Sequence, residues 1–173
     1  MEGVATRSPT LNGGEIMAKI LAFDQSTKVS AYSIFIDGNY VEHGLIDLHK
    51  MTDTSERVRA MGVELCNTIA KYEPDCVVIE EVAQQSNALT LKLLARIQGI
   101  IIGFCAAHNI KTHIVEPSKW RSTLQFKQGQ GVKRAQLKEQ GINYIQKNYG
   151  LDISEDESEA ICINDAAHKI FKF

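Results

Sequence analysis

The stretch KILAFDQSTKVSAYSIFIDG, from Lys19 to Gly38, decides how the rest of the chain is interpreted. An apolar run ends in Asp24, a polar QSTK corner follows, and a second apolar run extends from Ser30 to Ile36. This pattern predicts two strands joined by a short corner. A lone aspartate at a strand end is usually a turn former. The role of Asp24 therefore depends on what the rest of the chain places beside it.

The elements that follow predict a mixed sheet. Asp37-Gly38 between two apolar runs is a strong hairpin signal, so the first three strands should form an antiparallel meander. The further predicted elements are a third strand Tyr40–Leu48, a helix starting at Asp53 with Glu56 in its capping box, a buried strand Cys76–Glu80, an apolar helix Ser86–His108, a strand Ile110–Glu116, a basic helical region from Pro117 broken at Lys127–Gly131, and a helix from Ser154 onward. Strand–helix alternation after a meander implies a five-stranded α/β sheet, two strands of it parallel, with helices on both faces.

Composition and charge fit one globular domain in a reducing compartment. The chain has 173 residues, a net charge of −2 and four widely separated cysteines, which argues against a zinc site and a disulfide framework. We interpret residues 1–16 as a flexible leader or an artificial extension and residues 17–173 as the folded domain. The most membrane-like segment, Ile100–Ala107, is too short to span a bilayer. We therefore expect a cytoplasmic protein without a membrane partner.

Further carboxylates lie at the end of a predicted buried strand and on one face of the last predicted helix. Glu80 closes a strand that has no polar residue in its body, and burying an unpaired carboxylate is costly. Side chains alternate along a strand, so Glu81 should point away from the face of Glu80. In the last helix Ser154 is a plausible N-cap, and Asp156 and Glu159 share one face at i,i+3 spacing.

Helical geometry also assigns Asp165, which should lie about 180° from Asp156. We predict that Asp165 is a solvated surface acid.

The two acids on the inward face of the last helix, Asp156 and Glu159, should repel each other unless a cation binds between them. Oxygen-only clusters of this kind suit Mg²⁺ or Mn²⁺, and two such ions about 4 Å apart can promote phosphodiester cleavage. The alternative is that these acids only form turns and cap a helix.

Three segments in this order resemble the RuvC family of Holliday-junction resolvases, which has a ribonuclease H-like fold. They are ILAFDQSTKVSAYSIF, PDCVVIEEV followed by LTLKLLARIQGI, and DESEAICI. The resemblance implies that Asp24, Glu80 and Asp156 are catalytic metal ligands, with two Mg²⁺ or Mn²⁺ ions per site. Glu159 stands where the family usually has a second aspartate. The aromatic residue that often follows the second acid is replaced by AQQSN at residues 83–87.

The resemblance also implies partners. The segment from Lys111 to Lys147 contains eight basic residues and two acids, which gives it a local charge of +6. We expect it to bind DNA through Lys119, Arg121, Lys127, Lys133 and Arg134. Members of the family act as homodimers on branched double-stranded DNA, and the apolar helix Leu89–Phe104 is a candidate interface or a buried core helix. The sequence most resembles the versions carried by bacteriophages, which work in the cytoplasm of the bacterial host.

The leading functional hypothesis is a metal-dependent endonuclease that resolves four-way DNA junctions by paired nicks. The alternative is a non-catalytic protein that binds DNA structures on the same scaffold, although four retained acids argue against it. An actin-like ATPase or kinase would need a second phosphate-binding glycine corner and a longer chain, and the sequence shows neither.

Overall fold

The computed structural model describes residues 18–82 and 87–173, so the predicted leader and most of the AQQSN segment lie outside the described residues. One five-stranded sheet has the order β3-β2-β1-β4-β5. The elements are β1 (Lys19–Asp24), β2 (Val29–Ile36), β3 (Asn39–Asp47), α1 (Thr54–Tyr72), β4 (Cys76–Glu80), α2 (Ala88–Ala107), β5 (Lys111–Val115), α3 (Pro117–Thr123), α4 (Arg134–Tyr149) and α5 (Glu155–Phe171). The predicted elements are all present, with ends shifted by a few residues.

The pairing of the strands confirms the predicted meander. β1 pairs antiparallel with β2, and β2 pairs antiparallel with β3. The β2–β3 connection places Asp37 at φ 50° and Gly38 at φ 75°, the left-handed conformation that an Asp-Gly hairpin turn requires. On its other edge β1 pairs in parallel with β4, and β4 pairs in parallel with β5. β1 and β4 thus lie inside the sheet, and helices pack on both of its faces. Burial on two faces explains the nearly continuous apolar runs of these two strands.

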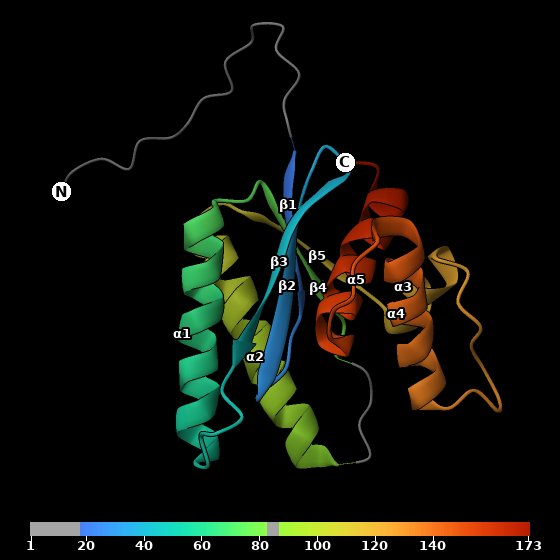
Figure 1. The fold of residues 1–173 in the computed structure, drawn as a ribbon. Helices are drawn as coiled ribbons and strands as arrows, with labels where there is room; N and C mark the ends of the chain where they lie inside the picture. The colour runs from blue at the N-terminus through green and yellow to red at the C-terminus, as the bar shows by residue number, and fades with distance from the viewer. Residues whose placement is uncertain (1–17, 83–86) are drawn as a thin grey trace, which may run out of the picture.

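Two hydrophobic clusters fill the two faces of the sheet, as the alternation of strands and helices predicted. Helices α1 and α2 cover one face, and α3, α4 and α5 cover the other (Figure 1). On the α1 side, Phe23, Met61, Leu65 and Ile97 belong to a wholly apolar cluster and are fully buried. On the α5 side, Trp120 and Ile161 are buried with the opposite side chains of the same strands.

Polar contacts fix α5 against the sheet. The Asn164 side chain is fully buried, and its Nδ2 donates to the carbonyl oxygens of Ile20 at 3.2 Å and Ser33 at 3.1 Å. In return the Ser33 hydroxyl donates to the carbonyl oxygen of Ala160 at 2.8 Å. Buried polar groups lose free energy unless they are hydrogen-bonded, so these contacts favour one rotation of α5 over its neighbours. That rotation determines which side chains at the start of α5 face the sheet.

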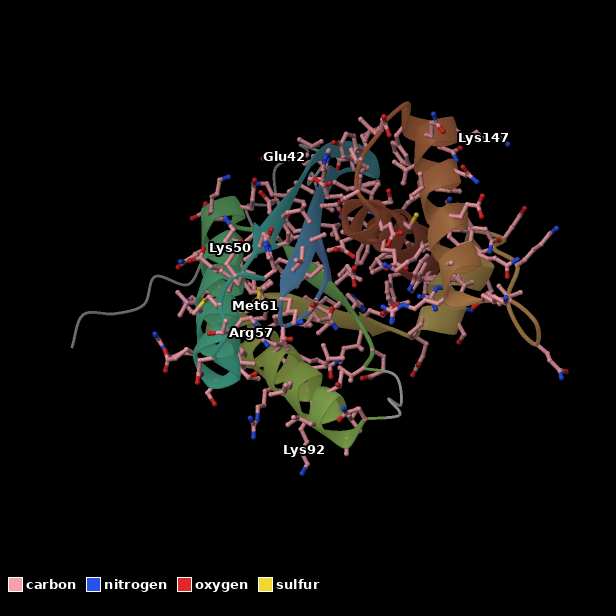
Figure 2. The ribbon with its side chains drawn as sticks, turned by 60° about the horizontal axis from the view of Figure 1, so that its bottom comes forward. Glu42, Lys50, Arg57, Met61, Lys92 and Lys147 are labelled. Atoms are coloured by element: carbon pink, nitrogen blue, oxygen red, sulfur yellow. The ribbon has the colours of Figure 1, made fainter. Side chains whose placement is uncertain are left out.

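Helix α2 is apolar and mostly exposed. Only Ile97, Ile101 and Cys105 of its 20 residues are buried, and Lys92 extends from its outer surface (Figure 2). An 18-residue window has a mean hydropathy of 1.6 and is 22% buried, so in the described ranges this one helix is long and apolar enough to cross a membrane, by length and composition only. The expectation of a span too short for a bilayer considered only Ile100–Ala107, which is the second part of this longer helix.

Candidate active site

Three carboxylates meet where the carboxyl end of β1 faces the first turn of α5. Single carboxylate oxygens of Asp24, Asp156 and Glu159 all lie within 4.8 Å of one another. The start of α5 is fixed by a capping box in which the Ser154 hydroxyl accepts from the Glu157 backbone N–H and the Glu157 carboxylate accepts from the Ser154 backbone N–H. This local structure places Asp156 and Glu159 one turn apart on the face toward β1. The predicted grouping of these three acids is present.

Glu80 lies at the edge of this trio. Its Oε1 accepts a hydrogen bond from Trp120 Nε1 at 2.6 Å and lies 3.7 Å from the Arg121 guanidinium. The same guanidinium nitrogen of Arg121 lies 3.7 Å from Glu159 Oε1, so one cation bridges the two glutamates. Glu81 turns the other way, as predicted, and its Oε1 accepts from Gln98 of α2 at 3.2 Å.

The acids experience each other's charge in a desolvated setting. Burial, and then the carboxylates of Glu159, Glu80 and Asp156, raise the pKa of Asp24 well above its usual range. Burial also raises the pKa of Glu80, against the opposing effects of the Trp120 hydrogen bond and Arg121. The pKa of Glu159 is raised in the same way by burial. The raised pKa values of these half-buried oxygen donors, Asp24, Glu80 and Glu159, mean that nearby cations do not fully compensate their negative charges.

This arrangement fits a divalent cation. Hard cations such as Mg²⁺ take carboxylate oxygens as ligands, and a bound cation would relieve both the repulsion and the desolvation of the acids. Cysteine and histidine are absent from the cluster of three, which disfavours softer metals. The residues present therefore suit the Mg²⁺ or Mn²⁺ that the sequence implied.

The acids open onto a cleft of about 490 Å³. Ser26, Thr27 and Lys28 of the β1–β2 corner line one part of it, and Arg121, Arg134 and Lys138 also line it. Of the five basic residues expected to bind DNA, Arg121 and Arg134 thus lie in the cleft. Lys119, Lys127 and Lys133 are exposed and do not line it. The predicted basic segment is therefore divided between the cleft and its surroundings.

Lys138 is a cleft residue that the sequence reasoning did not select. It pairs with Glu155, and its positive charge opposes the raised pKa of Asp24. The signal was present, because Lys138 follows Arg134 at i,i+4 spacing on one helix and so shares its face. Trp120 was also missed as a partner of Glu80, since nothing in its local sequence indicates the contact.

The prediction that Asp165 is a solvated surface acid is wrong. Its side chain is 15% exposed, its Oδ2 accepts from the Tyr144 hydroxyl of α4, and Lys169 Nζ lies 3.2 Å from the same oxygen. The helical rotation was correct, since Asp165 does point away from the acidic trio. Helix α4 packs on that side of α5, however, so the far side of the helix is an interface between helices.

Comparison with known proteins gives one consistent family. The profile of the family described as Crossover junction endodeoxyribonuclease RuvC matches residues 20–162, a segment that contains all four predicted site acids. A relative with the same description from Caldicellulosiruptor saccharolyticus is 29% identical over 111 residues, covering 61% of this chain and 67% of the relative. Another from Hydrogenovibrio crunogenus is 24% identical over 151 residues, covering 84% and 87%.

Solved structures share the fold. The structure of T. thermophilus RuvC in complex with Holliday junction substrate has a TM-score of 0.69 at 10% identity, covering 90% of this chain and 94% of that one. The yeast mitochondrial Holliday junction resolvase has a TM-score of 0.54 at 14% identity, covering 86% and 77%. At these identities the likeness shows the fold alone, and it confirms the predicted ribonuclease H-like sheet.

Proposed function

The chain belongs to the RuvC family of crossover junction endodeoxyribonucleases, and we propose that it resolves four-way DNA junctions by paired, metal-dependent nicks. The observation that carries the proposal is the trio of Asp24, Asp156 and Glu159, packed within 4.8 Å beside a cleft with basic lining residues. The cleft thereby combines carboxylates that can bind a metal ion with basic side chains that can bind a phosphate backbone. We take residues 17–173 as one nuclease domain.

Asp24, Asp156 and Glu159 are proposed to hold Mg²⁺ or Mn²⁺, with Glu80 as the fourth ligand and two ions per site. Bound divalent ions supply charge stabilisation to the attacking and leaving oxygens of a phosphodiester displacement. The protein's part is to hold the oxygen donors in place, which the Ser154 capping box and the Trp120–Glu80 hydrogen bond support. Arg121 partly compensates Glu80 and Glu159, each 3.7 Å away, and its proposed role is to contact a phosphate of the DNA.

The basic residues are proposed to act at two distances from the chemistry. Arg121 and Arg134, together with Lys138, would contact phosphates inside the cleft, because they line it with the acids. Lys119, Lys127 and Lys133 would contact the arms of the junction farther out, since they are exposed outside the cleft lining. Phosphate contacts position DNA without reading its sequence.

We propose that the protein is a homodimer formed through the exposed side of α2. Leu89 is 60% exposed and Ile102 is 37% exposed on this helix. A Cβ atom added at Gly99 or Gly103 would meet no atom within 4 Å, so a second helix has space to approach closely there. A dimer of this kind supplies two active sites for two strands of one junction.

The cytoplasm is the proposed compartment, and a bacteriophage origin stays a prediction.

A nicking assay tests the proposal directly. A synthetic four-way junction with one labelled strand at a time is incubated with the protein in Mg²⁺, and a linear duplex of the same sequence serves as the substrate control. We expect paired nicks on opposed strands of the junction and none on the duplex. Junction binding without cleavage in both Mg²⁺ and Mn²⁺ would instead support the alternative of a non-catalytic structure-binding protein.

A further inference from the structure

The side chain of Gln25 joins the two strands that carry Asp24 and Glu80. Its Nε2 donates to the Glu80 carbonyl oxygen, and its Oε1 accepts from the Glu80 backbone N–H at 3.3 Å. Gln25 is only 9% exposed, so this two-point contact is shielded from water. Gln98 of α2 adds a second, longer bond of 3.4 Å to the same carbonyl oxygen.

The contact continues the sheet where its backbone pairing stops. β1 and β4 are paired as far as Phe23 and Ile79, one residue before the two acids. In a strand the N–H and C=O of one residue face the same neighbour, and those of Glu80 face β1. The Gln25 amide supplies the donor and the acceptor that a further β1 residue would have supplied. Leaving these shielded backbone groups unpaired would destabilise the end of β4.

We propose that Gln25 is a positioning residue that sets the spacing between the Asp24 and Glu80 carboxylates, and through it the affinity of the site for its metal ions. Gln25 follows Asp24 directly, so the amide contact ties the end of β1 to the end of β4 beside both acids. Ligand spacing must hold to about 0.5 Å for a productive metal site. The proposal rests on the proposed function and concerns a residue outside the set of ligands.

The test compares Gln25→Met with Gln140→Met. Methionine keeps the length of glutamine but can form neither hydrogen bond. Gln140 is the matched control, because its amide also contacts both backbone groups of one residue, accepting from Lys127 N–H at 2.7 Å and donating to the Lys127 carbonyl oxygen at 3.1 Å, away from the cleft lining. Each variant is titrated with Mg²⁺ without DNA, by thermal unfolding and by the fluorescence of Trp120.

Trp120 is a suitable reporter because it is the single tryptophan of the chain and donates to Glu80 Oε1. For Gln25→Met we expect the Mg²⁺ concentration at half-maximal change to rise about tenfold, at the lower end of the losses seen when a neighbour of a metal ligand is removed. The half-maximal Mg²⁺ concentration for junction cleavage should rise in parallel, while junction affinity in EDTA stays within about twofold. Gln140→Met should leave both Mg²⁺ midpoints unchanged.

An unchanged Mg²⁺ midpoint in Gln25→Met, with or without a lower melting temperature, would overturn the positioning role and leave Gln25 as a structural residue. If Gln25→Met cannot be purified folded, Gln25→Asn is titrated in the same way, since its shorter amide reaches only part of the contact. Failure of the proposed function is distinguishable, because in that case the wild-type protein would nick the junction no more than an Asp24→Asn variant does.

Discussion

The two faces of the sheet differ in chemistry, although they share the same strands. Buried side chains between the sheet and helices α1 and α2 form an apolar cluster that includes the fully buried Met61, Leu65 and Ile101. On the α5 face the buried layer includes Ser33, Ser158 and Asn164, and it ends in the acidic trio. The α1 side also buries Arg57, whose guanidinium donates to the carbonyl oxygens of Thr27 and Met51, whereas the α5 face carries three carboxylates close together, which is costly without a compensating cation.

This difference indicates that activity depends on the α5 face, whereas both faces contribute apolar burial to stability. The apolar face supplies transfer free energy with no need for exact orientation. The α5 face holds under-compensated acids, whose repulsion opposes folding in the absence of metal. Substitutions on the two faces should therefore separate the two properties in opposite directions.

The largest effect is expected for Asp24→Asn. Cleavage in Mg²⁺ should fall by more than the roughly 10–100-fold that loss of a neighbour of a ligand costs. Metal-free stability should rise, because the folded pKa of Asp24 is raised by burial and by Glu159. Ionisation of Asp24 costs nothing below its unfolded pKa and costs progressively more as the pH rises through the folded pKa. Unfolding in urea should therefore show a larger gain at pH 8 than at pH 5, and equal stability at both would contradict the comparison.

On the apolar face, Leu65→Ala should do the reverse. Leu65 is fully buried in the α1 cluster, and such truncations cost about 2–5 kcal/mol. The nicking rate per folded molecule at 25 °C should stay within about twofold of wild type, since the acids keep their supports. Urea unfolding and a nicking time course measure the two effects. A loss of cleavage greater than the loss of folded protein would show that the two faces are coupled.

Ile102→Glu tests the outer side of α2, where the apolar face reaches solvent. A charge at this exposed site should leave the fold intact but weaken the homodimer at least about tenfold, or about 1.4 kcal/mol. Sedimentation gives the dimer affinity, and closed circular cruciform DNA distinguishes paired from single nicks. Leu45→Glu, at a residue of β3 that is 42% exposed, is the control and should stay dimeric.

On the polar side, neutralising Lys133 and Arg134 tests the basic segment. Arg134 lines the cleft and Lys133 lies outside it. Each phosphate contact contributes about 1 to the slope of log affinity against log salt, so the double glutamine variant should flatten the slope by up to about 2. Arg134→Gln alone should account for about 1 of this. An unchanged slope in the double variant would mean that the start of α4 faces solvent.

The smallest effect is expected for Asp165→Asn. The Asp165 carboxylate accepts from the Tyr144 hydroxyl of α4 and pairs with Lys169 of its own helix, α5. Its loss should lower the free energy of unfolding by about 1 kcal/mol. Cleavage should be unaffected, because the side chain points away from the acidic trio. A loss of nicking in Mg²⁺ would mean that the α4–α5 contact also adjusts the site.

The sequence allowed the fold and the acidic trio to be predicted because both depend on local signals. The Asp37-Gly38 turn determines the first hairpin, and the Ser154 capping box determines the residue at which α5 begins. Once that start is known, helical spacing brings Asp156 and Glu159 onto one face.

Contacts between distant segments could not be predicted in this way. The Trp120–Glu80 hydrogen bond and the Gln25–Glu80 contact join residues about 40 and 55 positions apart, and no spacing rule covers them. Asp165 was misassigned for the same reason, since a helical wheel gives its direction but not that α4 lies there. The exposure of α2 was likewise left open, because apolar composition is shared by core helices and interface helices.

The buried amide of Asn164 fixes the rotation and position of α5 on the sheet. For a helix with a wholly apolar inner face, only the shape of the packing determines its rotation and position on a sheet, because the hydrophobic effect itself has no direction. Asn164 is tied to two strand carbonyls, and Glu159 lies five residues away, about 7.5 Å along the same rigid rod. The position of the acidic side chains thus depends on a fully buried residue outside the site. A search for faster cleavage would therefore retain the amide at this position.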